Sequence, residues 1–311
     1  MEITRYLNRL RGRARENVGL PSTLGQDSGA AMAAVNQPLQ HIRVVPRRGW
    51  VAVEPTELWR HRSLLLAFAW REVRVIYKEA VVGVAWVLFQ PLITMVIFSI
   101  LFGRIAKMPS DGIPYTLFVL SGIVPWQYFN RTVSAGTNCL LTHKHILTKI
   151  YFPRFILPGI SIVAGLIDLA ISLLVLLAMM AGYGLLPGLQ AVWLPVFLLE
   201  GALFALGVVL WTSAANALYR DVGIALPFLL QVAMFATPVV YPASLVPAGW
   251  RWVLLVNPMA EVIGGVRWCL FGGAGGPTLL SQGVCLAFIA AILLGGAASF
   301  RRLESIFVDR V

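Results

Sequence analysis

The chain has 311 residues, of which 58% are hydrophobic and only 13% are charged. A soluble globular domain is closer to half apolar and a quarter charged, so this composition excludes an ordinary soluble domain and predicts an integral membrane protein. The net charge of +11 also invites the idea of nucleic-acid binding. The distribution of the basic residues instead favours membrane topology and contact with anionic lipid, and we expect no nucleic-acid partner.

The first part of the chain predicts a flexible region. Residues 16–40 are rich in Gly, Ala, Ser and Gln, which is typical of a linker. The arginines of residues 5–15 are not followed by the apolar core of a secretory signal. We expect residues 1–55 to form a flexible, basic, cytoplasmic N-terminus, and its stretch 1–45 carries no motif that indicates a role.

Residues 56–80 predict an amphipathic helix on the membrane surface. Thr56 is a plausible N-cap, and apolar residues then recur at helical intervals with cations between them. One interpretation is a surface anchor whose apolar face lies in the acyl boundary. The other is that the cations guide a phosphate-bearing lipid substrate, with lipid-phosphate contacts from Arg71, Arg74 and Lys78.

Residues 81–311 predict six membrane-spanning helices, because six stretches reach the roughly 18–20 apolar residues that a span needs. Thirteen of the 25 Lys and Arg residues precede residue 80, and most of the others fall in alternate loops. This bias places both termini in the cytoplasm. The predicted spans are Val82–Phe102, Tyr115–Gly136, Ile160–Gly182, Val192–Ala217, Gly223–Tyr241 and Leu279–Phe300.

The loop of residues 140–158 is basic and unusually apolar for a connector. Exposed aliphatic side chains such as Ile146 and Ile150 suggest a short helix that docks on a cytoplasmic partner. The alternative is an amphipathic turn that rests on lipid. His143 and His145 lack a nearby third ligand, so a metal pair is not favoured and we expect no metal.

The segment 242–277 is not a simple loop. Each of its apolar halves is too short to cross a bilayer, and Asn257–Pro258 divides them. We expect two short re-entrant half-helices that dip back from the outer face, with a flat interfacial hairpin held by tryptophans as the alternative. The predicted fold is therefore an all-α membrane protein with six transmembrane helices, an N-terminal interfacial helix and these half-helices.

Charges within the spans are few. Arg131, Asp168 and Glu200 each need a partner, a polar cavity or the interface, and we expect Arg131 to pair with Asp168 or Glu200. No phosphate-binding loop and no catalytic set is visible, so we expect no enzyme activity, no catalytic residue and no cofactor on this chain. The three cysteines have no metal or redox spacing and are expected to be free packing residues.

Several motifs, in order and at the right spacing, resemble those of the polysaccharide-export permeases. These are the membrane subunits of ABC transporters for O-antigen, capsule and teichoic acid. The resemblance covers about residues 46–311 and rests on WREVRVIYKEAVVGVAWVLFQP at 70–91, YTLFVLSGIVPWQYFNRTV at 115–133, LTKIYFPRFILP at 147–158, YRD at 219–221, and ATPVVYP with LVNP at 236–258.

The resemblance implies a homodimer in the bacterial inner membrane. It also implies two cytoplasmic ATPase subunits that hold the ATP and magnesium, and a lipid-linked polysaccharide as substrate. The ATPase contacts would be His143, Lys144, Ile150, Tyr151, Arg154, Arg220 and Asp221, and the periplasmic gate would include Trp250, Trp252 and Trp268. Candidate channel-lining aromatic residues are Trp86, Phe89, Trp126, Tyr128 and Phe129.

Two other classes compete with this hypothesis. An exporter of a drug or small lipid would share the architecture, because a fold alone does not determine the substrate. A membrane-embedded enzyme would need a nucleophile or an acidic metal site at the membrane face, and none is visible in the sequence. The basic surface helix and the aromatic content favour a bulky phosphorylated glycolipid.

Overall fold

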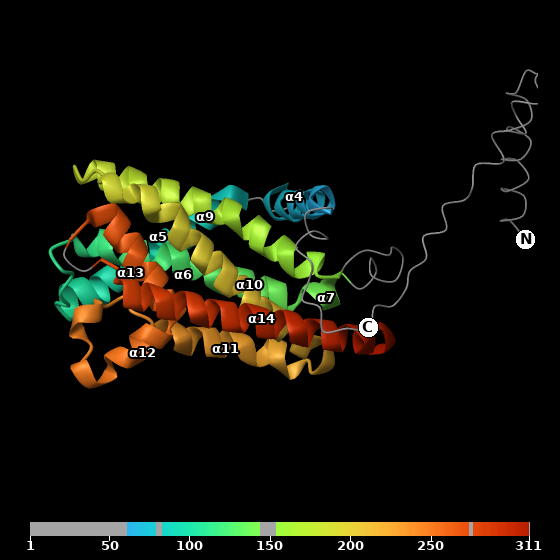
Figure 1. The fold of residues 1–311 in the computed structure, drawn as a ribbon. Helices are drawn as coiled ribbons and strands as arrows, with labels where there is room; N and C mark the ends of the chain where they lie inside the picture. The colour runs from blue at the N-terminus through green and yellow to red at the C-terminus, as the bar shows by residue number, and fades with distance from the viewer. Residues whose placement is uncertain (1–60, 79–82, 144–153, 274–275, 311) are drawn as a thin grey trace, which may run out of the picture. The chain divides into compact units, whose positions relative to one another are not determined.

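The computed structural model describes residues 61–78, 83–143, 154–273 and 276–310, and these ranges form helices and connecting turns without a strand. This confirms the all-α prediction, while the start predicted at Thr56 falls outside the described ranges. The longer helices (Figure 1) are α4 Arg62–Lys78, α5 Gly83–Phe98, α6 Tyr115–Thr137, α9 Ile156–Gly182, α10 Leu194–Leu218, α11 Asp221–Ala236, α13 Pro258–Phe271 and α14 Leu279–Arg310.

Shorter pieces mark the two ends of the helix bundle. The four-residue helix α7, Cys139–Thr142, follows α6 at one end. At the other end α12, Arg251–Val256, precedes α13, and two short 3₁₀ turns and the five-residue η2, Leu189–Trp193, lie in nearby connections. We refer below to the α7 end and the α12 end of the bundle, which lie at opposite sides of Figure 1.

Four helical stretches are long and apolar enough to cross a membrane, in the part of the chain that the structure describes. They are Leu88–Ile105, Ile156–Gly182, Leu189–Leu218 and Leu279–Leu303. The first continues α5 into the π-helix η1, Ser99–Ile105. A fifth span is possible only if the bent pair around Asn257 is counted as one. The chain is a multi-pass membrane protein, and the number six stays a prediction.

The two remaining predicted spans differ from these four for separate reasons. Helix α6 occupies the predicted position, but Gln127, Asn130 and Arg131 make it too polar for a typical lipid-facing span. Helix α11 has only 16 residues, and the prediction that it continues to Tyr241 is wrong. Its end has a local cause: Thr237 precedes a proline, which disfavours helical backbone, and it adopts φ −102° and ψ 140°.

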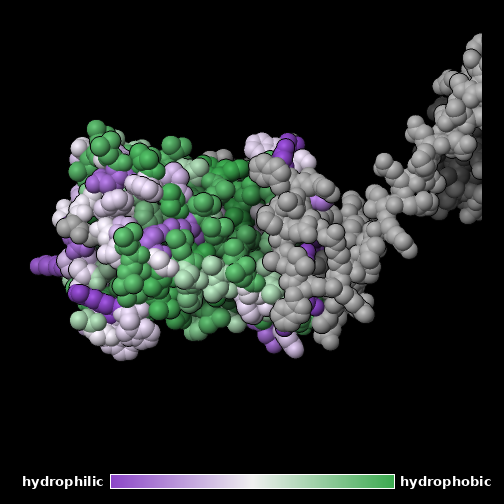
Figure 2. Space-filling view, viewed as in Figure 1, coloured by the Kyte–Doolittle hydropathy of each residue, from purple (hydrophilic) through white to green (hydrophobic). Residues whose placement is uncertain are grey.

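Helix α6 forms the centre of the bundle. Most of its side chains are buried, and it contacts α5, α9, α10, α11 and α13. In contrast, α11 buries only Leu226 and Leu230, while Ile224 and Phe228 are 78% and 67% exposed. Figure 2 shows hydrophobic side chains gathered over the middle of the bundle, with more hydrophilic residues toward the α12 end. All three cysteines are buried and free, as predicted.

Helix α4, which lies in the predicted interfacial segment, packs differently from the prediction. We expected its apolar face to contact lipid, but Leu65, Ala69 and Val73 are buried, and Leu65 and Ala69 belong to a core cluster with residues of α9 and α14. Leu65 also packs closely against Gly159 of α9. The exposed apolar residues are instead Leu66, Trp70 and Val75. The apolar face of α4 is buried against protein because α9 presents a complementary apolar surface.

Candidate functional site

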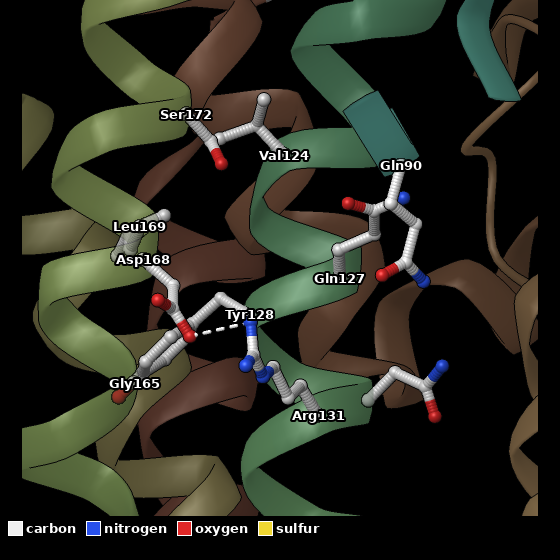
Figure 3. A pocket seen from close by; sticks show the side chains of 10 residues that line it. Gln90, Val124, Gln127, Tyr128, Arg131, Gly165, Asp168, Leu169 and Ser172 are labelled. Carbon is white, nitrogen blue, oxygen red and sulfur yellow. Dashed lines mark ion pairs between the residues drawn. The ribbon is translucent and has the colours of Figure 1, made fainter. Parts of the chain in front are cut away.

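A polar cavity of about 330 Å³ lies between α5, α6 and α9. It stands out because these helices are otherwise apolar, and polar groups in a membrane protein are retained where they meet a partner or a wet cavity. Figure 3 shows the polar side chains converging from all three helices. The lining residues are Gln90, Val124, Gln127, Tyr128, Asn130, Arg131, Gly165, Asp168, Leu169 and Ser172.

An ion pair crosses this cavity. A guanidinium nitrogen of Arg131 lies 2.7 Å from a carboxylate oxygen of Asp168, and the two side chains are 41% and 14% exposed. In Figure 3 they point toward one another from α6 and α9. Of the two partners predicted for Arg131, the structure selects Asp168. The amides of Gln90 and Gln127 leave additional hydrogen-bonding groups in the cavity.

Glu200 lies apart from this pair and is only 3% exposed. One of its carboxylate oxygens accepts a hydrogen bond from Gln282, while the other, Oε2, has no hydrogen-bond partner among the described residues. Ser281, next to Gln282, donates to Glu261 at 2.8 Å. Two carboxylates from α10 and α13 are thus held by consecutive residues of α14.

The predicted lipid-phosphate cations lie on the exposed side of α4. Arg71 and Arg74 are exposed, and the side chain of Lys78 falls outside the described part. Between them, Glu72 lies 3.6 Å from His143. The polar contact with Glu72 raises the pKa of His143 against the opposing effect of burial. The same contact lowers the pKa of Glu72, so the pair holds α4 to the α7 end.

The predicted ATPase contacts are only partly described. His143 is the last described residue after α7, while Lys144, Ile150 and Tyr151 lie outside the described residues, as does His145. Arg154 precedes α9, and Arg220 and Asp221 are exposed at the turn between α10 and α11. Within the described residues no group of three or more His, Cys, Asp and Glu side chains is placed to hold a metal.

A buried amide joins this turn to the end of α6. Asn216 of α10 is 1% exposed. Its Nδ2 donates to the carbonyl of Thr137 and to Oδ1 of Asn138, both at 3.1 Å. Its Oδ1 accepts from the backbone N–H of Gly223 at 2.9 Å. Asn216 therefore connects α6, α10 and α11 at the α7 end.

The candidate channel aromatics occupy different environments. Phe89 is 56% exposed, whereas Trp126 and Phe129 are 3% and 4% exposed in the protomer. Phe129 stacks on Phe204 with ring centroids 5.2 Å apart. Tyr128 borders the polar cavity, and the side chain of Trp86 is not described. Their role in lining a channel stays a prediction, for which Phe89 has the most accessible ring.

The helices at the α12 end bend sharply, as expected for two half-helices. The segments Ala248–Val256 and Pro258–Phe271 meet at 94°. Asn257 caps the second helix by accepting from the N–H of Met259, and it donates to Thr237 at 2.9 Å. Trp250 and Trp252 are 64% and 60% exposed, while Trp268 is half-buried. Their position relative to a membrane stays a prediction.

Arg267 of α13 binds two separate segments at this end, and no motif in the sequence assigned it a role. Its guanidinium donates to the carbonyls of Pro238, Val239 and Phe118 at 2.8, 2.6 and 3.2 Å. It also donates to Ser121 at 3.4 Å and lies over the Phe118 ring. Arg267 therefore joins α13 to the start of α6 and to the segment after α11.

The sequence indicated only weakly that Asn216 and Arg267 need partners within the protein. Each is a strongly polar side chain within an otherwise apolar helix, and such residues need a partner in protein. The partners themselves lie up to 149 positions away along the chain. No local pattern could have identified them.

Comparison with known proteins defines the class. Residues 63–271 match the ABC-2 type transporter family, and the chain belongs to this family, as the sequence motifs predicted. It is thus similar to the membrane subunits of such transporters.

Individual relatives carry names that refer to export. An O-antigen export system permease protein, RfbA, of Myxococcus xanthus is 30% identical over 67% of this chain and 80% of its own length. The polysialic acid transport protein KpsM of Escherichia coli is 24% identical over 72% and 85%. The inner membrane transport permease YadH of Escherichia coli (strain K12) is 27% identical over 67% and 86%.

Proposed function

We propose that this chain is the permease subunit of an ABC transporter that exports a lipid-linked polysaccharide, such as an undecaprenyl-linked O-antigen, across the bacterial inner membrane. The observation that carries the proposal is the similarity to an O-antigen export permease over 80% of that protein's length. In this arrangement the α7 end and both termini face the cytoplasm. The α12 end faces the periplasm, where the half-helices close the path.

ATP hydrolysis takes place on two separate ATPase subunits, which bind the ATP and magnesium. They contact the segment from His143 to Arg154 and the turn of Arg220 and Asp221. We expect Ile150→Asp to abolish copurification of the ATPase with this chain while membrane insertion is unchanged. Arg104→Asp at the opposite end is the control and should retain the ATPase. If the Ile150→Asp variant still copurifies with the ATPase, the proposed docking segment is ruled out.

The substrate approaches beside α4, where Arg71 and Arg74 are exposed and can contact lipid phosphates. The polar cavity nearby offers amide, hydroxyl and charged groups that suit a hydroxyl-rich sugar chain better than a hydrophobic drug. Reversal of both cations to Glu should reduce export and leave basal ATP hydrolysis unchanged. Equal export by this variant would leave the two arginines as membrane anchors.

The transporter contains two copies of this chain. Helices α5 and α11 expose large apolar side chains, including Phe89, Ile93, Phe228 and Phe235, and a second copy would cover part of this surface. Because the native cysteines are buried, Phe228→Cys tests this directly by disulfide cross-linking in membranes. A cross-linked dimer is expected, and Leu174→Cys on α9, which is equally exposed, should remain monomeric.

The decisive experiment is deletion of this chain in its host, followed by fractionation of glycan between the cell interior and the surface. Loss of surface polysaccharide with accumulation of the lipid-linked polymer inside is the expected result.

The second candidate is an exporter of a drug or small lipid, which the similarity to a transport permease without a named polysaccharide favours. Unchanged surface glycan would direct the search to such compounds.

A further inference from the structure

The end of α6, the last turn of α10 and the first turn of α11 meet at one buried side chain, that of Asn216. Its three hydrogen bonds, to Thr137, Asn138 and Gly223, measure 3.1, 3.1 and 2.9 Å. The partners lie 79 and 78 positions before it and seven after it. Asn216 is 1% exposed, so solvent does not replace a lost partner.

An amide suits this position for a chemical reason. The first turn of a helix has N–H groups without intrahelical acceptors, and the last turn has carbonyls without donors. Gly223 lies in the first turn of α11, where its N–H is shared between Asn216 Oδ1 at 2.9 Å and the carbonyl of Arg220 at 3.2 Å, and Thr137 ends α6. A side chain with both donors and an acceptor bonds both segments, and Asn provides this without a charge.

Close packing makes the connection rigid. A Cβ atom on Gly223 would lie 2.7 Å from Asn216 Oδ1, and one on Gly136 would lie 2.5 Å from Val209. The hydroxyls of Thr137 and Thr212 form a second link between α6 and α10 at 2.6 Å. These approaches leave little room for α6, α10 and α11 to shift independently at the α7 end.

We propose that Asn216 is a positioning residue that makes the end of α6 and the turn at residues 219–221 move as one body. This deepens the proposed function, because both segments lead into predicted ATPase contacts. Displacement of either segment then passes to the start of α11. Helix α11 buries few of its own side chains, so its position depends on how its ends are held, and its far end adjoins the carbonyls that Arg267 binds.

The first measurement needs neither ATPase nor substrate. Spin labels on Ala135→Cys and Tyr219→Cys, both at exposed positions, report the distance between the two segments in the full chain. A narrow distribution is expected with Asn216 intact and a clearly broader one in Asn216→Ala. Ser213→Ala is the matched control, because Ser213 is equally buried one turn earlier and its hydroxyl has no hydrogen-bond partner among the described residues. Equal widths in all three proteins would overturn the proposal.

The second measurement uses the assembled transporter in vesicles and compares glycan exported per ATP hydrolysed. Asn216→Ala should retain the ATPase and its hydrolysis, with export per ATP reduced by about tenfold. Ser213→Ala should match the unmodified chain. A merely structural residue would lower the yield of folded transporter without changing this ratio, and that result would also overturn the proposal.

Asn138→Ala provides the same tests if the Asn216 variant does not fold. It removes one of the three hydrogen bonds at an exposed position, so a smaller broadening in the same direction is expected. If the unmodified chain exports no glycan, the proposed function fails, while the spin-label result still decides whether Asn216 couples the segments.

Discussion

One polar side chain holds each end of helix α11 to its neighbours, but the two side chains differ in charge and in hydrogen-bonding groups. At the α7 end the neutral amide of Asn216 joins α6, α10 and α11. At the α12 end the charged guanidinium of Arg267 joins α13 to α6 and to the segment after α11. We call these two sets of contacts joints. Each joint also requires a glycine in its partner helix, Gly223 at the α7 end and Gly122 at the α12 end, because a Cβ atom there would lie too close to the joint.

The difference follows from the backbone groups that each side chain meets. A helix start presents free N–H groups and the segment beyond a helix end presents free carbonyls. At the α7 end both kinds occur together, so a side chain that donates and accepts is needed. At the α12 end the groups that face the side chain are the carbonyls of Pro238 and Val239 beyond α11 and of Phe118 in α6, so a side chain with five donors and no acceptor suffices. The chemistry of each joint therefore follows from the backbone groups that face it.

The largest expected effect comes from removal of the charged joint. Arg267→Leu removes the guanidinium donor from the carbonyls of Pro238 and Val239, whereas the Phe118 carbonyl still accepts from Ser121. We expect a loss of about 3–5 kcal/mol in unfolding free energy. Thermal unfolding of the purified protein in detergent measures this. Arg267→Lys should recover only part, because an ammonium lacks the planar fork. Arg104→Leu, at an exposed position, is the control, and equal stability of both Leu variants would contradict the assigned role.

The glycine of the same joint gives the next effect. A Cβ atom on Gly122 would lie 2.5 Å from the carbonyl oxygen of Val239 and 2.7 Å from the Arg267 guanidinium. Gly122→Ala should therefore destabilise by about 1–3 kcal/mol, since backbone must move. Gly264→Ala on α13 has no atom within 4 Å and should be neutral or slightly stabilising. The difference between their melting temperatures tests the close approach.

The α7 end adds a contact whose strength depends on pH, which the neutral amide lacks. The raised pKa of His143 means that its contribution is full below its ordinary value of 6.5 and is lost as the pH rises through the folded value. The lowered pKa of Glu72 means that its contribution is present above 4.5 and is lost as the pH falls through the folded value. The pair is strongest between these limits. Glu72→Gln should lower the melting temperature most near about pH 5.5, and the difference should shrink as the pH rises through the folded pKa of His143. A pH-independent difference would argue against the ion pair.

The smallest effect is expected at Glu200, a buried carboxylate of α10. It bonds Gln282, but its second oxygen has no hydrogen-bond partner among the described residues. A neutral amide of similar size loses little there, so Glu200→Gln should change stability by less than about 0.5 kcal/mol. Glu200→Ala leaves a cavity and is expected to be worse. A large loss of stability in the Glu200→Gln variant would contradict this prediction and show that the charge of Glu200 is needed.

Much of the fold was predictable because helix position is a local property of the sequence. Helices occur at all six predicted spans, and the break at Asn257–Pro258 appears where a proline follows a capping side chain. The failures have equally physical causes. Helix α11 ends early because Thr237 precedes a proline, and the apolar face of α4 packs on α9 where contact with lipid was expected.

The candidate site was less predictable than the fold. The need of Arg131 for an acidic partner could be inferred, yet the choice of Asp168 over Glu200 depends on which helices adjoin α6. The roles of Asn216 and Arg267 were not predicted at all, since neither lies in a motif of known chemistry. Their partners come from segments far away along the chain.

By itself, the sequence determined that this is a helical membrane protein of the ABC-2 type, where its apolar segments lie, and where they break. The apolar segments and their breaks follow from composition, proline positions and the length of apolar runs, while the family follows from the resemblance of the motifs. Only the tertiary structure decided that the most polar predicted span, α6, is the central helix. Hydropathy measures the cost of transfer to lipid, whereas Arg131 of α6 pairs with Asp168 of α9 and Gln127 and Asn130 line the polar cavity. That pairing exists only after the helices have packed.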